Sequence, residues 1–205
     1  MQFNQRVLQY LKRVQAMAKT GLAYAQDPYD IERYEELRDS TNTLLSDSSN
    51  QNLEDISYHF EKLDPYPTPK VDVRGLILKQ GKVLLIQEIS DQQWALPGGW
   101  CDIGFSPSEN IIKEAREESG FEVAVDRFLA IWDKSKHDHP EALEYVYKLC
   151  FLCSITGGQL NPGHEALDAA FFDIDQLPPL SLHRNTESQI QELCRLAESG
   201  GVVFD

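Results

Sequence analysis

Three glutamates near the middle of the chain have the residue type and the spacing of a metal site. Glu114, Glu117 and Glu118 occupy positions i, i+3 and i+4, so their carboxylates share one face of an α-helix. Like charges in this arrangement destabilise a helix by roughly 0.2–0.5 kcal/mol per pair. Divalent cations that prefer oxygen ligands, such as Mg²⁺ or Mn²⁺, offset that repulsion. The cluster indicates a metal-binding helix, and the alternative is an acidic helix face in solvent.

The residues on either side of the cluster mark the two ends of its helix. Ser106 and Glu109 have the spacing of a capping box, and Pro107 suits the first helical position. Gly120 suits the left-handed residue that ends a helix. Only six residues, 100–105, separate the glycine pair 98–99 from the N-cap Ser106. The glycine carbonyls are therefore expected beside the acidic face.

Around these glutamates the sequence resembles the signature of the Nudix hydrolases. That signature reads Gly, five residues, Glu, seven residues, Arg-Glu, an apolar residue, any residue, Glu-Glu, any residue, Gly and an apolar residue. The positions that match are Gly99, Glu114, Ala115, Glu117, Glu118, Gly120 and Phe121. The resemblance implies that Mg²⁺ or Mn²⁺ is ligated by the Gly99 carbonyl and by Glu114, Glu117 and Glu118.

Two positions depart from the Nudix signature. Phe105 stands where the family has Glu, and Lys113 stands where it has Arg. In the family these two residues mostly support and orient the ligand carboxylates. Lys113 keeps the positive charge but lacks the planar fork of Arg, and the capping box engages Glu109. Asp102 is the nearest other acid of the loop and is a candidate for supporting the ligands.

The segments around the signature predict a sheet that carries this helix. Residues 71–78 and 82–88 read as a β-hairpin that turns at Gln80-Gly81. Further elements are expected as strands at 122–134, 144–155 and 169–172 and as a last helix at 185–198. These elements predict an α/β fold, namely an α/β/α sandwich with a mixed sheet. The order of elements is similar to that of Nudix domains.

The first sixty-odd residues predict a separate helical domain. Apolar spacing favours helices at 3–20, 29–45 and 53–63, with Gly21 ending or bending the first. Prolines then stiffen the chain. We therefore expect a small all-helical N-terminal domain at 1–64, a Pro-rich linker at 65–69 and a Nudix hydrolase domain at 70–205.

Residues 19–34 are similar to the N-terminal extension of a bacterial Nudix subgroup. Members of that subgroup are described as CDP-choline pyrophosphatases or ADP-ribose pyrophosphatases. The resemblance implies a homodimer, with the helical domain in dimerisation or in support of the substrate site. Tyr24, Tyr29 and Tyr34 are better explained as packing residues than as a platform for a nucleobase.

The composition is that of a soluble globular protein with an acidic surface. The 205 residues are 41% hydrophobic and 25% charged, with a formal net charge of -14. Duplex nucleic acid is disfavoured as a partner because clustered Lys and Arg are missing. Neither a membrane span nor a signal peptide is expected, and four cysteines without a second CxxC indicate reduced thiols. We expect a cytoplasmic protein.

The expected reaction is metal-assisted attack of water on a nucleoside diphosphate joined to a second group X. Its products are a nucleoside monophosphate and phospho-X. Within the signature, Glu117 or Glu118 could act as the general base. Outside it our choice is Glu165, because Nudix enzymes often place a Glu on a late loop opposite the metal helix. Asp168 and Glu141 are further candidates, and the alternative for Glu165 is a solvated loop acid.

Two residues outside the metal face are candidates for substrate binding. Arg74 in the first strand could contact phosphate or, alternatively, form a structural ion pair with Asp72. Trp100 could hold a choline head group by a cation–π contact, although the ring also suits the core. His137 and His139 have a spacing that fits either a zinc site or a solvated loop.

The resemblance alone favours CDP-choline over ADP-ribose as the substrate. A non-enzymatic alternative also stays open, since some Nudix-like domains act as ligand sensors or interaction modules. Phe105 and Lys113 are changes with which such a drift begins. The three intact glutamates favour an enzyme, because a binding module has no need of a self-repelling acidic face.

Overall fold

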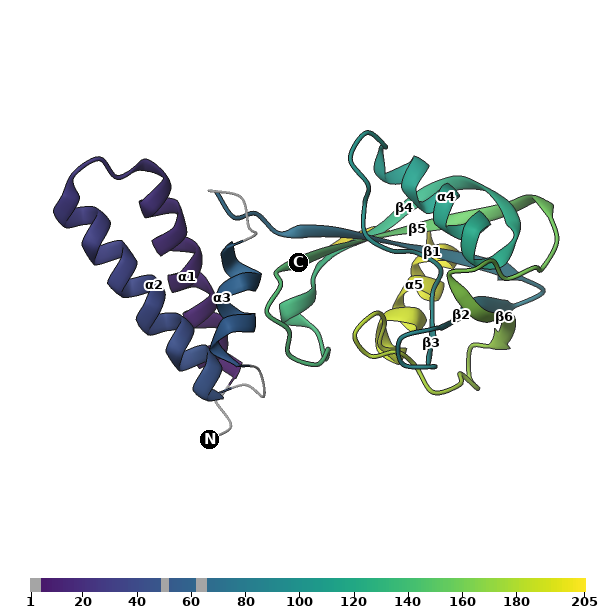
Figure 1. Ribbon diagram of the computed structural model, residues 1–205. Coiled ribbons are helices and arrows are strands. Elements are labelled where there is room, and N and C mark those ends of the chain that lie inside the picture. Colours follow the sequence, from purple (N-terminus) through teal and green to yellow (C-terminus); the bar gives the residue numbers. More distant parts are fainter. Residues whose placement is uncertain (1–4, 49–51, 62–65) are drawn as a thin grey trace. The chain divides into compact units, whose positions relative to one another are not determined.

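The computed structural model describes residues 5–48, 52–61 and 66–205. The chain divides into two compact units, Met1–Thr68 and Pro69–Asp205, and each is described by itself (Figure 1). Within the described ranges, no helix combines the length and the apolar character needed to cross a membrane.

The first unit contains three helices, α1 (Gln5–Tyr24), α2 (Pro28–Ser48) and α3 (Leu53–Glu61). Together they bury a small apolar core, made of Leu11, Val14, Ala18, Leu45, Ile56 and Phe60. The predicted N-terminal helical region is confirmed. The parts of the sequence predictions that fall on residues 3–4 and 62–65 lie outside the described residues.

Of the two alternatives predicted for Gly21, that it ends the first helix or bends it, the first is wrong. α1 continues through Gly21 as far as Tyr24. The ring of Tyr34 in α2 lies directly against Gly21, where the Cβ of any other residue would collide with it. This glycine therefore serves the close approach of two helices and does not stop the first one.

The second unit is built on a mixed sheet of seven strands. The strand order is β3-β2-β1-β5-β4-β7, and β6 pairs with β2. β1 is antiparallel to β2 and parallel to β5. The bounds are β1 (Lys70–Lys79), β2 (Lys82–Glu88), β3 (Trp94–Ala95), β4 (Phe121–Asp133), β5 (Val146–Gly158), β6 (Ala166–Asp173) and β7 (Val203–Phe204).

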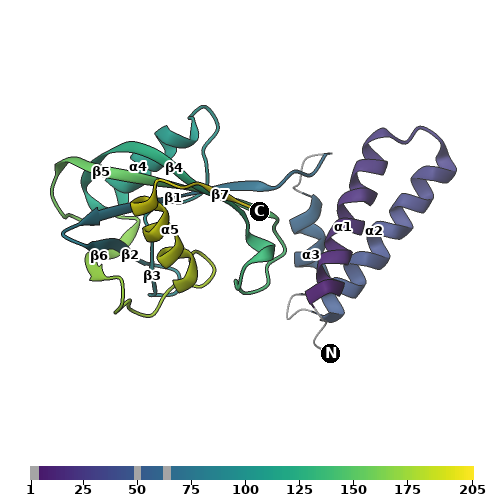
Figure 2. The same cartoon turned by 180° about the vertical axis from the view of Figure 1, so that it is seen from behind.

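Two helices, α4 (Pro107–Ser119) and α5 (Glu187–Ser199), cover opposite faces of this sheet (Figures 1 and 2). Ile111 of α4 belongs to one buried apolar cluster together with Val73 of β1. Ile190 of α5 belongs to a second cluster on the other face. The predicted α/β/α sandwich with a mixed sheet is confirmed.

The strand predictions differ from the structure at several strand ends, with β5 at Val146–Gly158 where 144–155 was expected, and they miss the two-residue strands β3 and β7. The hairpin turn at Gln80-Gly81 is as predicted, and both residues have positive φ (54° and 77°). β6, however, begins at Ala166 and not at residue 169. A two-residue strand is too short to show the alternation by which strands are recognised in a sequence.

Candidate active site

α4 begins and ends at its sequence signals. The Ser106 hydroxyl accepts a hydrogen bond from Glu109 N (3.3 Å), and the Glu109 carboxylate accepts one from Ser106 N (2.7 Å). Gly120 follows the helix at φ 78° and donates its N–H to the Arg116 carbonyl (2.9 Å). These caps fix the first and last residues of the helix, and so they determine where along the helix its acidic residues lie.

Three carboxylates converge between α4 and the loop before β6. One oxygen each from Glu114, Glu117 and Glu165 lies within 4.8 Å of the others, a group that could hold a metal ion. Glu114 is buried, whereas the Glu117 side chain is 40% exposed. Asn161 N donates to the Ser119 carbonyl (2.9 Å) and ties the loop to the end of α4. Glu165, predicted as the general base, thus lies beside two predicted metal ligands.

The other two candidates for the base do not belong to this group. Asp168 lies in β6, where its carboxylate accepts a hydrogen bond from the backbone N–H of Ala169 (2.7 Å). Glu141 is exposed in the loop before β5. The carboxylate group found among the described residues contains neither of them, so the geometry favours Glu165.

The glycine pair 98–99 brings backbone against the cluster. Gly98 has a φ of 138° and lies so close to the Val73 carbonyl that a side chain would collide with it. A Cβ at Gly99 would lie 3.3 Å from the Glu114 carboxylate. The Gly99 carbonyl accepts a hydrogen bond from Val73 N (2.9 Å) and keeps a second lone pair. The residue whose carbonyl is a predicted ligand therefore contacts Glu114.

Glu118 stands apart from the other two signature glutamates. Its buried carboxylate accepts a hydrogen bond from the backbone N–H of Gly98 (2.7 Å) and is not one of the three converging groups. Burial raises the pKa of Glu118 to about 8, against the lowering influence of Arg74 and of the Gly98 N–H. In the structure Glu118 thus contacts the backbone of Gly98, the residue before the predicted carbonyl ligand Gly99.

The surroundings of Glu117 and Glu114 show whether these residues suit a metal ion. The Oε2 atom of Glu117 is buried, and the polar contact that it makes among the described residues is the ion pair with Lys113 Nζ at 3.3 Å. Burial raises the pKa of Glu114, and the charges of Glu165 and Glu117 raise it further. A divalent cation would relieve the mutual repulsion of these carboxylates. The all-oxygen donor set fits Mg²⁺ or Mn²⁺.

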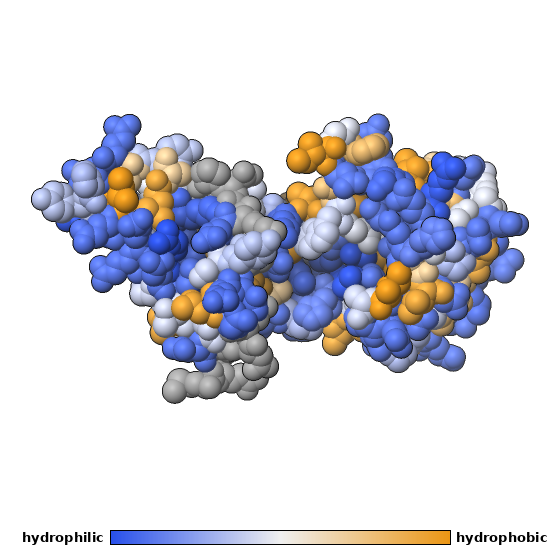
Figure 3. All heavy atoms as spheres, viewed as in Figure 1, coloured by the Kyte–Doolittle hydropathy of each residue, from blue (hydrophilic) through white to orange (hydrophobic). Residues whose placement is uncertain are grey.

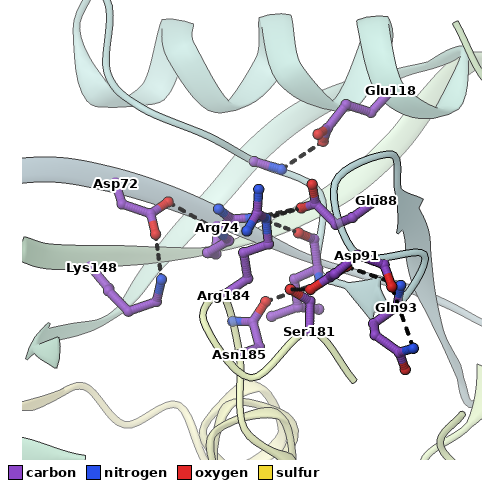
Figure 4. Close-up of polar contacts among 12 residues, drawn as sticks. Asp72, Arg74, Glu88, Asp91, Gln93, Glu118, Lys148, Ser181, Arg184 and Asn185 are labelled. Carbon is purple, nitrogen blue, oxygen red and sulfur yellow. Dashed lines mark hydrogen bonds and ion pairs between the residues drawn. The ribbon is translucent and has the colours of Figure 1, made fainter. Parts of the chain in front are cut away.

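Arg74 is the centre of a buried ionic network beneath α4 (Figure 4). Its Nε donates to Asp72 (2.9 Å), and its Nη1 donates to the Leu96 carbonyl (3.0 Å). Lys148 pairs with the same Asp72. Burial alone would raise the pKa of Asp72, but Arg74 and Lys148 outweigh it and hold that pKa below its usual value. The structure thus contains the ion pair with Asp72 that was the alternative to a phosphate contact.

We expect Asp72→Asn to lower the free energy of unfolding by about 3–5 kcal/mol, because it leaves two buried cations without their shared counter-charge. Urea unfolding of the two proteins measures the difference. Asp173→Asn is the matched control, since its ion pair with Lys82 is exposed and should contribute less than about 1 kcal/mol. Equal losses in both variants would contradict this account of the network.

Comparison with known families identifies both parts of the chain. Residues 67–193 match the NUDIX domain. The chain belongs to the Nudix hydrolases. Residues 5–60 match a second family, described as a UDP-X-like, N-terminal oligomerisation domain. Nudix hydrolases generally use divalent metal ions and act on nucleoside diphosphate derivatives.

The similar proteins are named for two kinds of substrate, ADP-ribose and UDP-X. "Putative ADP-ribose pyrophosphatase YjhB" of Bacillus subtilis is 45% identical over 186 residues, which cover 91% of this chain and 89% of that protein. A UDP-X diphosphatase of known crystal structure is 35% identical, with a TM-score of 0.64 over 98% of this chain and 99% of that one. An ADP-ribose pyrophosphatase from Streptococcus suis is 41% identical, with a TM-score of 0.61 over 67% of this chain and 100% of that one.

The two departures from the Nudix signature have separate structural consequences. Lys113 Nζ lies 3.0 Å from Asp102 and 3.3 Å from Glu117, so one ammonium bridges the loop and a predicted ligand. Hydrogen bonds to Asp102 and Glu117 raise the pKa of Lys113. Asp102 thus supplies a carboxylate partner for this Nudix helix. Phe105, at the signature's Glu position, is 52% exposed.

Trp100 follows the glycine pair and is 51% exposed. Lys70 Nζ lies over its indole ring, 5.1 Å from the ring centroid. One face of the ring therefore already carries a cation. A choline head group on that face would meet a like charge.

The HxH segment is held by two different contacts. His139 Nδ1 lies 2.7 Å from the Leu182 carbonyl, and burial lowers the pKa of His139 to about 4. His137 Nε2 lies 3.1 Å from the Asp205 carboxylate. The metal-binding group that the described residues form includes neither histidine. A neutral, buried His139 also differs from the solvated loop that was the other interpretation.

Sequence reasoning missed three residues of the ionic network, namely Glu88, Lys148 and Arg184. Glu88 pairs with Arg184 and lies 3.9 Å from Arg74 Nη1, and Lys148 pairs with Asp72. A lysine inside the apolar run of β5 was an available signal, because a buried ammonium requires a counter-charge. Glu88 ends a buried strand and gives no comparable signal.

Proposed function

We propose that this Nudix hydrolase is a metal-dependent pyrophosphohydrolase that cleaves a nucleoside diphosphate linked to X into a nucleoside monophosphate and phospho-X. The convergence of Glu114, Glu117 and Glu165 within 4.8 Å carries the proposal. The names of the relatives support it, since both ADP-ribose and UDP-X are nucleoside diphosphates joined to a further group.

Glu114, Glu117 and the Gly99 carbonyl would hold Mg²⁺ or Mn²⁺. The bound ion would neutralise charge on the diphosphate and lower the pKa of a coordinated water. Glu118 remains a predicted ligand, and through its hydrogen bond it holds the N–H of Gly98, next to the carbonyl ligand. Lys113 fixes the carboxylate of Glu117 through its second contact with Asp102.

Glu165 is the proposed general base. Its carboxylate is exposed, and one of its oxygens lies within 4.8 Å of an oxygen of Glu114 and of Glu117, so it would be placed to take a proton from a water beside the bound diphosphate. Attack of that water on one phosphorus breaks the phosphoanhydride bond. The bridging oxygen then leaves with the other phosphate.

ADP-ribose is the substrate that we propose first, and CDP-choline the second. The names of two relatives at 45% and 41% identity contain ADP-ribose. The expectation of CDP-choline depended on the resemblance alone, and the face of Trp100 that could have held a choline head group already carries Lys70. Trp100 and Arg74 stay predictions as substrate contacts.

The helical unit is proposed to join two copies of the chain into a homodimer. The oligomerisation family matched by residues 5–60 supports this assignment. We also propose that the enzyme acts in the cytoplasm. The four cysteines are free thiols, and three of them are buried, as expected in a reducing compartment.

Phosphate release with a coupled phosphatase tests the proposed reaction. The substrates are ADP-ribose, CDP-choline and a UDP-sugar, each with Mg²⁺ or Mn²⁺. We expect hydrolysis of ADP-ribose that stops when the metal is chelated. Absence of hydrolysis across the whole panel would instead favour a Nudix-like ligand sensor.

A further inference from the structure

A second feature adjoins the carboxylate cluster on the outer side of α4. This open pocket has a volume of about 510 Å³ and is lined by Phe105, Glu109, Ile112, Lys113, Arg116 and Glu117. Glu117 also belongs to the metal-binding group. The pocket therefore shares Glu117 with the carboxylate group beside which the diphosphate of the proposed substrate would lie.

The pocket has an apolar wall that is open to solvent. Phe105 is 52% exposed and Ile112 is 37% exposed. In Figure 3, orange apolar spheres lie at the upper rim of this unit, over the loop that leads into α4. Because Asp102 partners Lys113, the side chain at position 105 is not needed as a carboxylate and is free to form this wall.

Arg116 is the pocket's unengaged polar group. Lys113 is held by Asp102 and Glu117, and Glu109 closes the capping box. The guanidinium of Arg116, by contrast, makes no ion pair or hydrogen bond with any of the residues that the structure describes. It offers up to five N–H donors beside an aromatic ring.

We propose that this pocket holds the group X of the substrate and that X is a sugar. The ring of Phe105 packs on the C–H face of the sugar, which carries no hydroxyl and is buried favourably against an aromatic ring. Arg116 donates hydrogen bonds to the hydroxyls at the edge of the sugar. The inference rests on the proposed pyrophosphohydrolase function.

Two substrates that differ only in X test this assignment, namely ADP-ribose and the methyl ester of ADP. In Phe105→Ala and in Arg116→Gln we expect kcat/KM for ADP-ribose to fall about tenfold, mainly through a higher KM, because one pocket contact discriminates by roughly that factor. The methyl ester, which has nothing to place in the pocket, should be cleaved by the variants as by the wild type. Phe204→Ala, at an exposed aromatic residue of β7, is the control and should change neither value.

The outcomes separate the inference from the function on which it rests. Equal losses on both substrates, or no loss on either, would overturn the assignment of the pocket. The proposed pyrophosphohydrolase function would still stand. A wild-type protein that cleaves neither substrate would overturn the proposed function and the inference with it. Thermal unfolding of each variant shows whether a loss of activity reflects misfolding. Because Phe105→Ala and Arg116→Gln alter different groups of the same pocket, each variant tests the assignment separately.

Discussion

Glu117→Gln is expected to lower kcat/KM about a thousandfold, equivalent to about 4 kcal/mol of transition-state stabilisation. The substitution keeps the shape of the side chain and removes one charge. Glu117 converges with Glu114 and Glu165 within 4.8 Å, and a cation bound there would offset the repulsion among the three carboxylates. An amide in its place is a weaker ligand for a hard cation and also loses its ion pair with Lys113.

The measurement for Glu117→Gln is the dependence of turnover on Mg²⁺ concentration. We expect the concentration for half-maximal activity to rise together with the fall in kcat/KM. Glu198→Gln, an exposed residue of α5, should leave both values unchanged. A Glu117→Gln enzyme with wild-type activity and metal dependence would remove Glu117 from the metal site.

The helix that carries the cluster could be predicted because its signals are local. Ser106, Pro107, Glu109 and Gly120 each act within one turn of the helix end that they define, and the structure has its ends at those residues. The family could also be recognised, since the signature is confined to residues 99–121. Spacing alone, however, predicted that all three signature glutamates converge, whereas in the structure Glu118 lies apart from Glu114 and Glu117.

The separation of Glu118 from the other two glutamates depends on contacts that are distant in sequence. The Gly98 N–H reaches Glu118 only because the strand pairing sets the glycine pair against α4. In the same way, Lys148 reaches Asp72 because the parallel register of β5 and β1 places the two residues opposite each other. Hydrophobic patterns do not specify the register between strands so far apart, so these partners could not be predicted.

The position of Glu165 also depends on contacts between residues that are distant in sequence. The sequence placed it on a late loop, and the pairing of β6 with β2 together with the Asn161–Ser119 hydrogen bond carries that loop to α4. The result is an exposed carboxylate next to two predicted ligands. From this position Glu165 can act as a base or as a further ligand, and the two roles give different results on substitution.

Glu165→Gln is expected to lower kcat by about 10²–10⁴-fold while the Mg²⁺ concentration for half-maximal activity stays unchanged, because a general base contributes that much without holding the ion. The amide occupies the same space but cannot accept the proton of the attacking water. Turnover measured across a series of Mg²⁺ concentrations separates the two effects. A higher metal requirement with activity restored at saturating Mg²⁺ would make Glu165 a ligand and return the role of base to Glu118 or Asp168. Unchanged turnover would remove Glu165 from the mechanism, since neither a base nor a ligand in this cluster tolerates loss of its charge without a change in rate.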